Sequence, residues 1–361
     1  MFQRIYARRA LHRAEEHDLE MLRVAVDGFN LAADRRGMGR YARVVLDTLG
    51  ASSDIALTVV VQTRRDLPLA SDLATFRTDY VTLGEARRRR FDATWFPWNG
   101  MRFRFDGGSV VTIHDIFAFR YPHRNPIARR REQRPIRRAV EQASVLTTVS
   151  KFSAREIVAQ FGFPLKRLTV ASPVPSEFWK PVSPAQRAPY FLFIAGPEPR
   201  KNAAMLFSAF ARAFPRQDFQ LVIAGTLSIA DEQILRQSGI AYAHVAPSDE
   251  ELRVLYSGST ALLMPSRDEG YGLPAVEAMA CGAAVIAADR GGLPEACDGA
   301  ARLLSPDDSE QWQDALREVA ANAERREELR ARSLARASRI DRSQPGKVIA
   351  ERLRRAAEAV P

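Results

Sequence analysis

Two glutamates, Glu269 and Glu277, lie eight positions apart in a stretch that also contains Gly270 and Gly272. Carboxylates accept hydrogen bonds from hydroxyl groups, so two glutamates facing one ligand suit a sugar and a ribose. Glycine lets the backbone approach a ligand closely, and free N–H groups at a helix N-terminus bind the oxygens of an anion. The pattern therefore predicts a binding site for a ligand with sugar hydroxyls. The alternative is a capped helix with one solvated glutamate, which any α/β protein can contain.

The elements that would position these glutamates are a strand, a polar loop, a helix and a second strand. The sequence predicts a strand ending at Met264, a loop over 266–272, a helix from Pro274 to a stop at Gly282, and a buried strand over 284–288. Such units form parallel sheets, and ligands bind at the carboxyl ends of their strands. The first glutamate is then expected in the loop and the second about one turn into the helix.

The stretch from Glu269 to Gly282, EGYGLPAVEAMACG, resembles the E-x7-E signature of glycosyltransferase family 4, whose members are retaining, metal-independent enzymes. The resemblance implies an α/β fold of two Rossmann-like domains facing across a cleft, which is called GT-B. It also implies that Glu269 holds the hexose hydroxyls and that Glu277 holds the ribose diol. The other donor-binding residues implied in this loop are Gly270, Tyr271, Gly272 and Leu273.

Two motifs in the amino-terminal half resemble the same family. The segment Gly37–Tyr41, GMGRY, lies between a predicted strand over 22–27 and a helix predicted from Arg40. The residues alone favour a tight turn without a ligand, whereas the resemblance places Gly39 at the donor diphosphate. His114 follows the fourth predicted strand. A histidine there is usually structural, but the resemblance implies that it contacts the transferred sugar.

A third motif lies in the loop GPEPRKN, residues 196–202, which precedes a helix predicted over 203–214. Arg200 and Lys201 stand near the N-terminus of that helix, so two cations and free N–H groups could converge on a diphosphate. An exposed Arg-Lys pair is the alternative. The loop departs from the family pattern at Pro197, where many members carry a basic residue. With these motifs, the expected catalytic residues are His114, Arg200, Lys201 and Glu269.

The chain length of 361 residues indicates two domains. Five prolines in the segment 172–189 indicate a linker between them. The family resemblance extends from Met21 to the final helix, which packs on the first domain in relatives. The predicted organisation is an N-terminal extension over 1–20, an acceptor domain over 21–172, a linker over 173–189, a donor-nucleotide domain over 190–338 and a C-terminal segment over 339–361. The extension is either a basic amphipathic anchor or a segment preceding a true start at Met21.

Composition excludes several classes of protein. The only two cysteines, Cys281 and Cys297, form neither a disulfide framework nor a zinc motif, which favours a reducing compartment. Residues 1–20 lack the apolar segment of a signal peptide, and no run of apolar residues is long enough to span a membrane. We therefore expect a cytoplasmic protein. No Asp-x-Asp motif occurs, which agrees with the metal independence that the resemblance implies.

Positive charge is concentrated in the amino-terminal half. Residues 1–180 carry 31 Lys and Arg against 19 Asp and Glu, whereas the remainder carries 22 against 24. Arginines cluster over 87–90 and over 124–138. Such clusters are usually solvated, but they also attract phosphates or anionic lipid headgroups, at about 1 kcal/mol per basic residue near a charged membrane. No recognised nucleic-acid module frames them, so peripheral membrane contact is the partner that they suggest.

These observations favour a retaining hexosyltransferase that uses a nucleotide diphosphate sugar and no cofactor. The three motifs resemble those of mannosyltransferases that assemble bacterial surface polysaccharides, so GDP-mannose is the preferred donor, with UDP-hexoses left open. The expected acceptor is a glycan or a lipid-linked oligosaccharide at the inner membrane face. Two alternatives remain: another enzyme on this fold, such as a nucleotide-sugar epimerase or phosphorylase, and a non-catalytic basic protein that binds polyanions or membranes.

Overall fold

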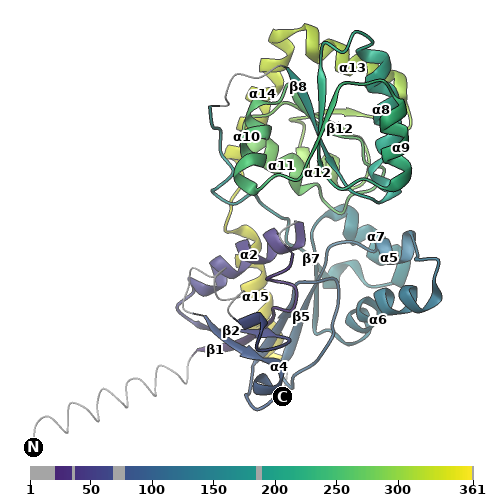
Figure 1. Cartoon of the computed structure of the whole chain (residues 1–361). Helices are drawn as coiled ribbons and strands as arrows, with labels where there is room; N and C mark the ends of the chain where they lie inside the picture. Colours follow the sequence, from purple (N-terminus) through teal and green to yellow (C-terminus); the bar gives the residue numbers. More distant parts are fainter. Residues whose placement is uncertain (1–20, 35–36, 68–77, 184–188, 360–361) are drawn as a thin grey trace, which may run out of the picture. The chain divides into compact units, whose positions relative to one another are not determined.

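The computed structural model describes residues 21–34, 37–67, 78–183 and 189–359, which fold into two compact α/β units (Figure 1). The predicted extension over 1–20 lies outside the described residues. The first unit takes in the chain up to Val149, Ala154–Ser172 and the residues from Ser343 onward. The second unit takes in Ser150–Ser153 and Pro173–Arg342.

The first unit is built on a parallel sheet of seven strands with the order β3-β2-β1-β4-β5-β6-β7. The strands are β1 (Leu22–Asp27), β2 (Ile55–Val61), β3 (Asp79–Thr82), β4 (Ala93–Phe96), β5 (Gly108–Ile113), β6 (Val145–Thr148) and β7 (Leu168–Val170). The helices are α2 (Gly37–Gly50), α4 (Leu83–Ala86), α5 (Phe117–Arg120), α6 (Pro126–Gln142), α7 (Lys151–Phe161, in this unit from Ala154) and α15 (Gln344–Glu358), with a 3-10 turn over Leu165–Arg167.

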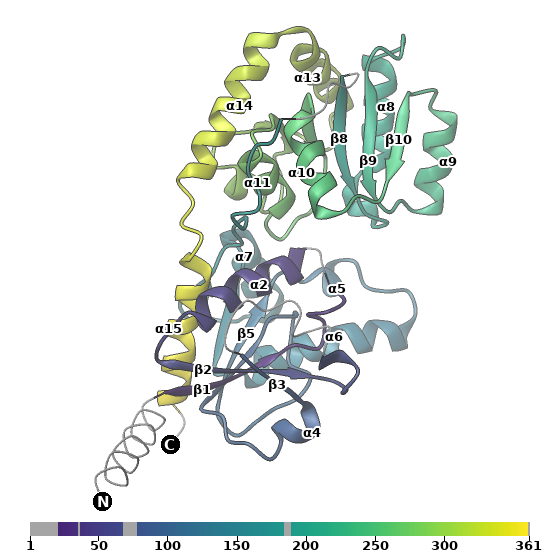
Figure 2. The same ribbon diagram turned by 60° about the vertical axis from the view of Figure 1, so that its left-hand side comes forward.

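The two faces of this sheet carry separate apolar cores because neighbouring residues of a strand point to opposite faces. Trp95 belongs to the core beneath α2 and α15, and the next residue, Phe96, belongs to the core beneath α6 and α7. The C-terminal helix α15 contacts α2, β4 and β5 (Figure 2). Gly108 permits the contact with β5, because a Cβ atom there would lie 2.1 Å from the carbonyl oxygen of Ala356.

The second unit contains a parallel sheet of six strands with the order β10-β9-β8-β11-β12-β13. The strands are β8 (Tyr190–Ala195), β9 (Gln220–Gly225), β10 (Tyr242–Val245), β11 (Ala261–Met264), β12 (Val285–Ala288) and β13 (Arg302–Leu304). The helices are α8 (Ala203–Ala213), α9 (Ile229–Gln237), α10 (Asp249–Gly258), α11 (Leu273–Ala280), α12 (Leu293–Cys297), α13 (Ser309–Ala321) and α14 (Ala323–Ser338), with a 3-10 turn over Pro199–Lys201.

The proline-rich segment that we predicted as a linker begins inside the second unit. Trp179 is buried, and its ring lies 5.6 Å from that of Tyr256 in α10. The guanidinium of Arg253 stacks over Phe178 at 4.6 Å. These contacts explain why the residues from Pro173 group with the second sheet; residues 184–188 lie outside the described part of the chain.

The helix predicted from Arg40 begins at Gly37, three residues earlier, so Gly39 lies in the first turn of α2 rather than in a loop before it. A Cβ atom on Gly39 would lie 1.8 Å from the carbonyl oxygen of Asp34. The side chain of Arg43 donates to the same carbonyl at 2.9 Å. Glycine is therefore required at this position by the preceding loop of the chain itself.

Candidate active site

The loop that follows β11 holds a buried carboxylate between two cations. Lys201 Nζ donates to Glu269 Oε1 at 2.6 Å, and Arg200 Nη1 donates to Glu269 Oε2 at 3.3 Å. The hydroxyl of Ser266 donates to Oε1 at 2.8 Å. The three charged side chains are only 12% to 13% exposed. The structure thus brings together three of the residues that we predicted to be catalytic and adds Ser266, which sequence analysis missed.

The charge state of Glu269 follows from these partners. Burial alone raises the pKa of the carboxyl, but the charges of Lys201 and Arg200 outweigh it and hold the pKa below its usual range. Hydrogen bonds from Lys201 and Ser266 act in the same direction. Glu269 is therefore ionised at neutral pH, and one negative charge faces two positive charges.

Asn202 fixes the loop that carries the two cations. It has a left-handed backbone conformation, with φ 60°, between the 3-10 turn over Pro199–Lys201 and α8. Its amide nitrogen Nδ2 donates to the carbonyl oxygens of Pro265 and Pro306, at 3.2 and 2.7 Å. A side-chain amide that bridges two neighbouring loops explains why the cations meet the loop after β11.

Glycines let the loop after β11 pack against the turn that precedes α12. Gly272 has a φ of 116°, a conformation that L side chains rarely adopt, and it stands directly before α11. A Cβ atom on Gly292 would lie 2.5 Å from the carbonyl oxygen of Gly270. Gly270, Tyr271, Gly272 and Leu273 are thus placed by close backbone packing, and Tyr271 and Leu273 are buried.

The second glutamate of the motif lies in α11, as the sequence predicted. Glu277 is the fifth residue of this helix and is 1% exposed. The predicted end of the helix is confirmed, because Cys281 is the C-cap residue of α11 and Gly282 follows it with a φ of 76°. Burial, with the charge of Glu277, raises the pKa of the Cys281 thiol to about 12. This thiol is protonated at neutral pH and is therefore not a nucleophile.

In the first unit, His114 directly follows the carboxyl end of β5. Its ring atom Nε2 lies 2.8 Å from the carbonyl oxygen of Pro97, and its backbone N–H donates to Asn99 Oδ1 at 2.6 Å. The ring of Tyr41 packs edge-on against it at 5.0 Å. Burial lowers the pKa of His114 to about 4, so the ring is neutral at pH 7. A carbonyl can only accept, so the proton of the neutral ring is on Nε2.

Asp27, the last residue of β1, is a buried carboxylate at the same edge of the sheet, and sequence analysis did not assign it. It is fully buried, and its Oδ1 accepts from the N–H of Phe29 at 3.1 Å. Within the described residues its Oδ2 has no hydrogen-bond partner. Burial raises the pKa of Asp27 to about 7. A carboxylate ending an apolar strand was the signal that could have identified it.

We expect Asp27→Asn to stabilise the protein at alkaline pH. The pKa of Asp27 rises from 3.8 to about 7 on folding, so wild-type stability decreases as the pH rises through this window. The neutral amide escapes this loss and keeps the acceptor for Phe29, so the gain should reach up to about 4 kcal/mol at about pH 8 and vanish below about pH 4. Urea unfolding at several pH values measures it. Asp218→Asn is the control, because Asp218 is exposed and forms no ion pair within the described residues. A variant that is less stable than wild type at alkaline pH would contradict the assignment.

The geometry of the second unit suits an anionic ligand with hydroxyl groups. Lys201 and Arg200 offer positive charge at the carboxyl end of β8, and the N-termini of α8 and α11 offer free N–H groups nearby in the chain. Glu269 and Glu277 offer carboxylate oxygens. Within the described residues, no group of three or more His, Cys, Asp and Glu side chains is arranged to hold a metal ion.

Comparisons with known proteins identify the chain's relatives. A family model described as glycosyl transferases group 1 matches residues 176–336. The chain is 30% identical over 254 residues to the O-antigen chain mannosyltransferase B of Escherichia coli, covering 64% of this chain and 66% of that protein. It is 32% identical over 184 residues to the MMP alpha-(1->4)-mannosyltransferase of Mycolicibacterium hassiacum, covering 48% of this chain and 45% of that protein. These matches span about half to two thirds of the relatives.

Solved structures show the same fold at low sequence identity. WaaG, a glycosyltransferase involved in lipopolysaccharide biosynthesis, superposes with a TM-score of 0.71 at 16% identity, over 92% of this chain and 99% of that one. The Anabaena protein HepE, solved with UDP and glucose, gives a TM-score of 0.70 at 16% identity, over 93% of this chain and 100% of that one. The predicted α/β fold with two parallel sheets is therefore confirmed.

Proposed function

We propose that this protein, in which residues 176–336 form a glycosyl transferases group 1 domain on the GT-B fold, transfers a hexose from a nucleotide diphosphate sugar to a glycan or lipid-linked acceptor. The observation that carries the proposal is the buried cluster of Arg200, Lys201 and Glu269. It lies within the region that the family model matches. An epimerase or phosphorylase on the same fold is the second candidate, but the family match and the mannosyltransferase relatives favour transfer.

The chemistry explains what this cluster does. Breaking the bond between the anomeric carbon and the diphosphate oxygen leaves positive charge on the sugar and negative charge on the diphosphate. Fixed cations and N–H donors that face the diphosphate lower the barrier, because they stabilise charge where it develops. Arg200 and Lys201 supply this charge, so we expect transfer to proceed without a metal ion or other cofactor.

Retention of configuration follows if the acceptor attacks from the face that the diphosphate leaves. In this step the acceptor oxygen bonds to the anomeric carbon, and a diphosphate oxygen takes the proton of the acceptor hydroxyl. By resemblance to the family, Glu269 holds the hexose hydroxyls, His114 orients the transferred sugar and Gly39 contacts the diphosphate. A covalent sugar trapped on any side chain of the working enzyme would overturn this mechanism.

The donor that we favour is GDP-mannose. Several relatives carry the name mannosyltransferase, among them the Escherichia coli and Mycolicibacterium hassiacum proteins. A thermal-shift series with GDP, UDP, ADP and their sugar conjugates, each with and without EDTA, tests donor and metal together. A ligand at about a hundred times its Kd stabilises the protein by about 2.7 kcal/mol. A shift with guanine nucleotides that EDTA does not change is expected; a shift only with uridine nucleotides would contradict GDP-mannose, and no shift with any would contradict the proposal.

Glu277→Ala is expected to weaken nucleoside diphosphate binding by about 10- to 100-fold, because a carboxylate that accepts from ribose hydroxyls contributes about 1.5 to 3 kcal/mol. Titration calorimetry with ribo- and 2′-deoxyribonucleotides measures the effect. The wild type should discriminate between the two sugars and the variant should not. Glu277→Gln, which retains the shape of this buried side chain, is the control for folding. A normal donor KM in Glu277→Ala would refute the ribose role.

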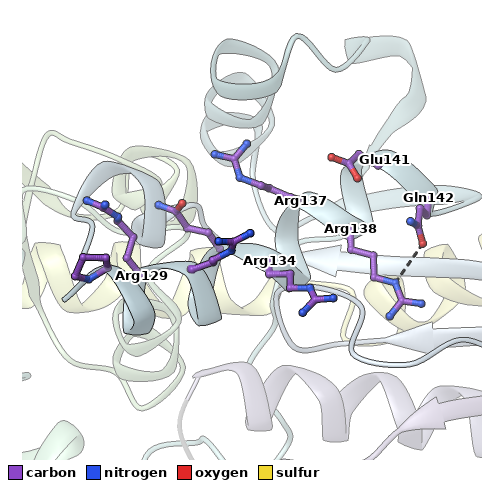
Figure 3. A pocket seen from close by; sticks show the side chains of 9 residues that line it. Arg129, Arg134, Arg137, Arg138, Glu141 and Gln142 are labelled. Atoms are coloured by element: carbon purple, nitrogen blue, oxygen red, sulfur yellow. Dashed lines mark hydrogen bonds between the residues drawn. The ribbon is translucent and has the colours of Figure 1, made fainter. Parts of the chain in front are cut away.

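We also propose that the protein contacts anionic membranes through α6. A hollow of about 1050 Å³ lies beside this helix. Figure 3 shows side chains that line it, with Arg137 extending in a different direction from Arg134 and Arg138. Ile127, at the start of α6, is 80% exposed, which suits an interface between headgroups and lipid tails. Among the described helices, none is long and apolar enough to cross a bilayer. Sedimentation with vesicles that contain phosphatidylglycerol tests the contact.

A further inference from the structure

A second hollow, of about 780 Å³, lies in the first unit. It contains none of the predicted donor-site residues, and most of its lining lies outside α6. We call it the arginine hollow. Seven arginines line it: Arg23, Arg87, Arg89, Arg90, Arg102, Arg104 and Arg138. The lining contains only two acidic residues, Asp92 and Asp106. Arg138 also lines the hollow beside α6, so the two surfaces meet there.

Two of these arginines are neutralised by neighbouring carboxylates. Arg23 holds Asp92 with two bonds, from Nε at 3.1 Å and from Nη2 at 2.7 Å. Arg89 forms an ion pair with Asp79. Within the described residues, in contrast, Arg87, Arg90 and Arg104 form no ion pair, and all three are exposed. Their mutual repulsion costs folding free energy, so a compensating anion would stabilise the protein.

The arginines are carried by a rigid floor of phenyl rings. The segment 101–106, MRFRFD, alternates apolar and charged residues. Met101 and Phe103 are buried, whereas Arg102 and Arg104 are exposed. The rings of Phe103 and Phe105 lie 5.3 Å apart, and those of Phe91 and Phe105 lie 5.0 Å apart. Each of these phenylalanines directly follows an arginine of the hollow. The packed rings therefore fix the backbone positions from which the guanidinium groups extend.

Most of the hollow's lining lies near the amino ends of strands, whereas Phe29 and Leu83 follow the carboxyl ends of β1 and β3. Arg23 is near the start of β1, Asp92 directly precedes β4 and Gly107 directly precedes β5. His114 follows the other end of β5, about 20 Å away for a strand of this length. Ligands of parallel α/β sheets bind at the carboxyl ends. A ligand in the arginine hollow would thus occupy a different place from one that contacts His114.

We propose that the arginine hollow binds an anion with two or more linked phosphate groups. A guanidinium group binds phosphate oxygens with paired hydrogen bonds. Several guanidinium groups around one cavity therefore suit a ligand with several phosphate groups better than a ligand with a single carboxylate. The cavity is large enough for a diphosphate with a further group attached. The phosphates can come from a soluble diphosphate or from a lipid headgroup.

Hydrogen exchange of the full chain with inorganic pyrophosphate tests the site by position. Pyrophosphate should slow exchange in peptides covering 83–92 and 101–108. Slower exchange confined to 196–202 and 269–277 would report the donor site instead and overturn the arginine hollow, and no change at 83–92 and 101–108 would overturn it as well. Because the two sets of peptides are separate, failure of one proposal is distinguishable from failure of the other. In a parallel sample, vesicles that contain a lipid diphosphate are compared with vesicles of phosphatidylglycerol alone, which carries a single phosphate. Slower exchange in the same peptides with the lipid diphosphate only identifies a headgroup as the source, and no slowing by either vesicle identifies a soluble anion.

Two triple variants with the same loss of charge supply the control. Arg87→Gln, Arg90→Gln and Arg104→Gln together should weaken pyrophosphate binding at 83–92 and 101–108 by about 10-fold or more. Arg129→Gln, Arg130→Gln and Arg134→Gln together, on α6, should leave it within about 2-fold. Equal losses in both variants would show attraction by net charge alone and overturn a specific site. In low salt, the triple variant of Arg87, Arg90 and Arg104 should also melt at a higher temperature than wild type, because repulsion among the arginines of the hollow is reduced.

Discussion

Lys201→Ala is expected to lower the rate of sugar transfer by about 10² to 10³-fold, with a smaller change in donor KM. Lys201 is the cation nearest to Glu269, and its side chain is 12% exposed, so the field of its charge is weakly screened by water. Removing one fixed donor that faces a developing negative charge costs about 3 to 4 kcal/mol of transition-state stabilisation. The effect should appear in kcat because the diphosphate gains charge only as the bond to the sugar breaks.

The measurement is steady-state transfer to acceptor, or donor hydrolysis where no acceptor is known, for wild type and variant. Lys166→Ala is the matched control, because Lys166 is an exposed lysine outside the candidate site. Lys201 also stabilises the ionised carboxylate of Glu269, so its loss could disturb folding. Circular dichroism shows whether the variant is folded. A folded Lys201→Ala protein with a normal kcat would exclude this residue from the transition state.

The sequence predicted the elements around the site because their signals are local. The strand at β11, the loop with glycines and the helix α11 each follow from apolar runs interrupted by proline and glycine. The strands that it did not predict are β3, β7 and β10, and all three lie at the edges of their sheets. Edge strands are short and half-exposed, so they lack a continuous apolar run, and only pairing with a neighbouring strand reveals them.

The sequence identified the charged residues of the site but not their mutual pairing. Lys201 and Glu269 are 68 positions apart, and each was assigned to the ligand separately. In the structure they also hold each other, with Arg200 and Ser266. Asn202 ends the motif GPEPRKN but was assigned no role by sequence analysis, and it positions the cations by donating to two loop carbonyls. Such contacts depend on the packing of distant loops, for which a single sequence has no periodic signal.

Glu269→Gln is expected to destabilise the second unit by about 3 to 5 kcal/mol at neutral pH, because it leaves two buried cations without their carboxylate. Glu269 has a lowered pKa in the folded protein, so its contribution is complete above the unfolded value of 4.5 and is lost as the pH falls through the folded value. The difference between wild type and variant should therefore shrink in acid. Urea unfolding across this pH range measures it. Glu232→Gln, which removes the half-exposed carboxylate that pairs with Arg236, should cost less than about 1 kcal/mol. A Glu269→Gln protein as stable as wild type at neutral pH would show that Arg200 and Lys201 do not need this carboxylate in the folded protein. Only measurements with a bound diphosphate could then support a binding role for the two cations.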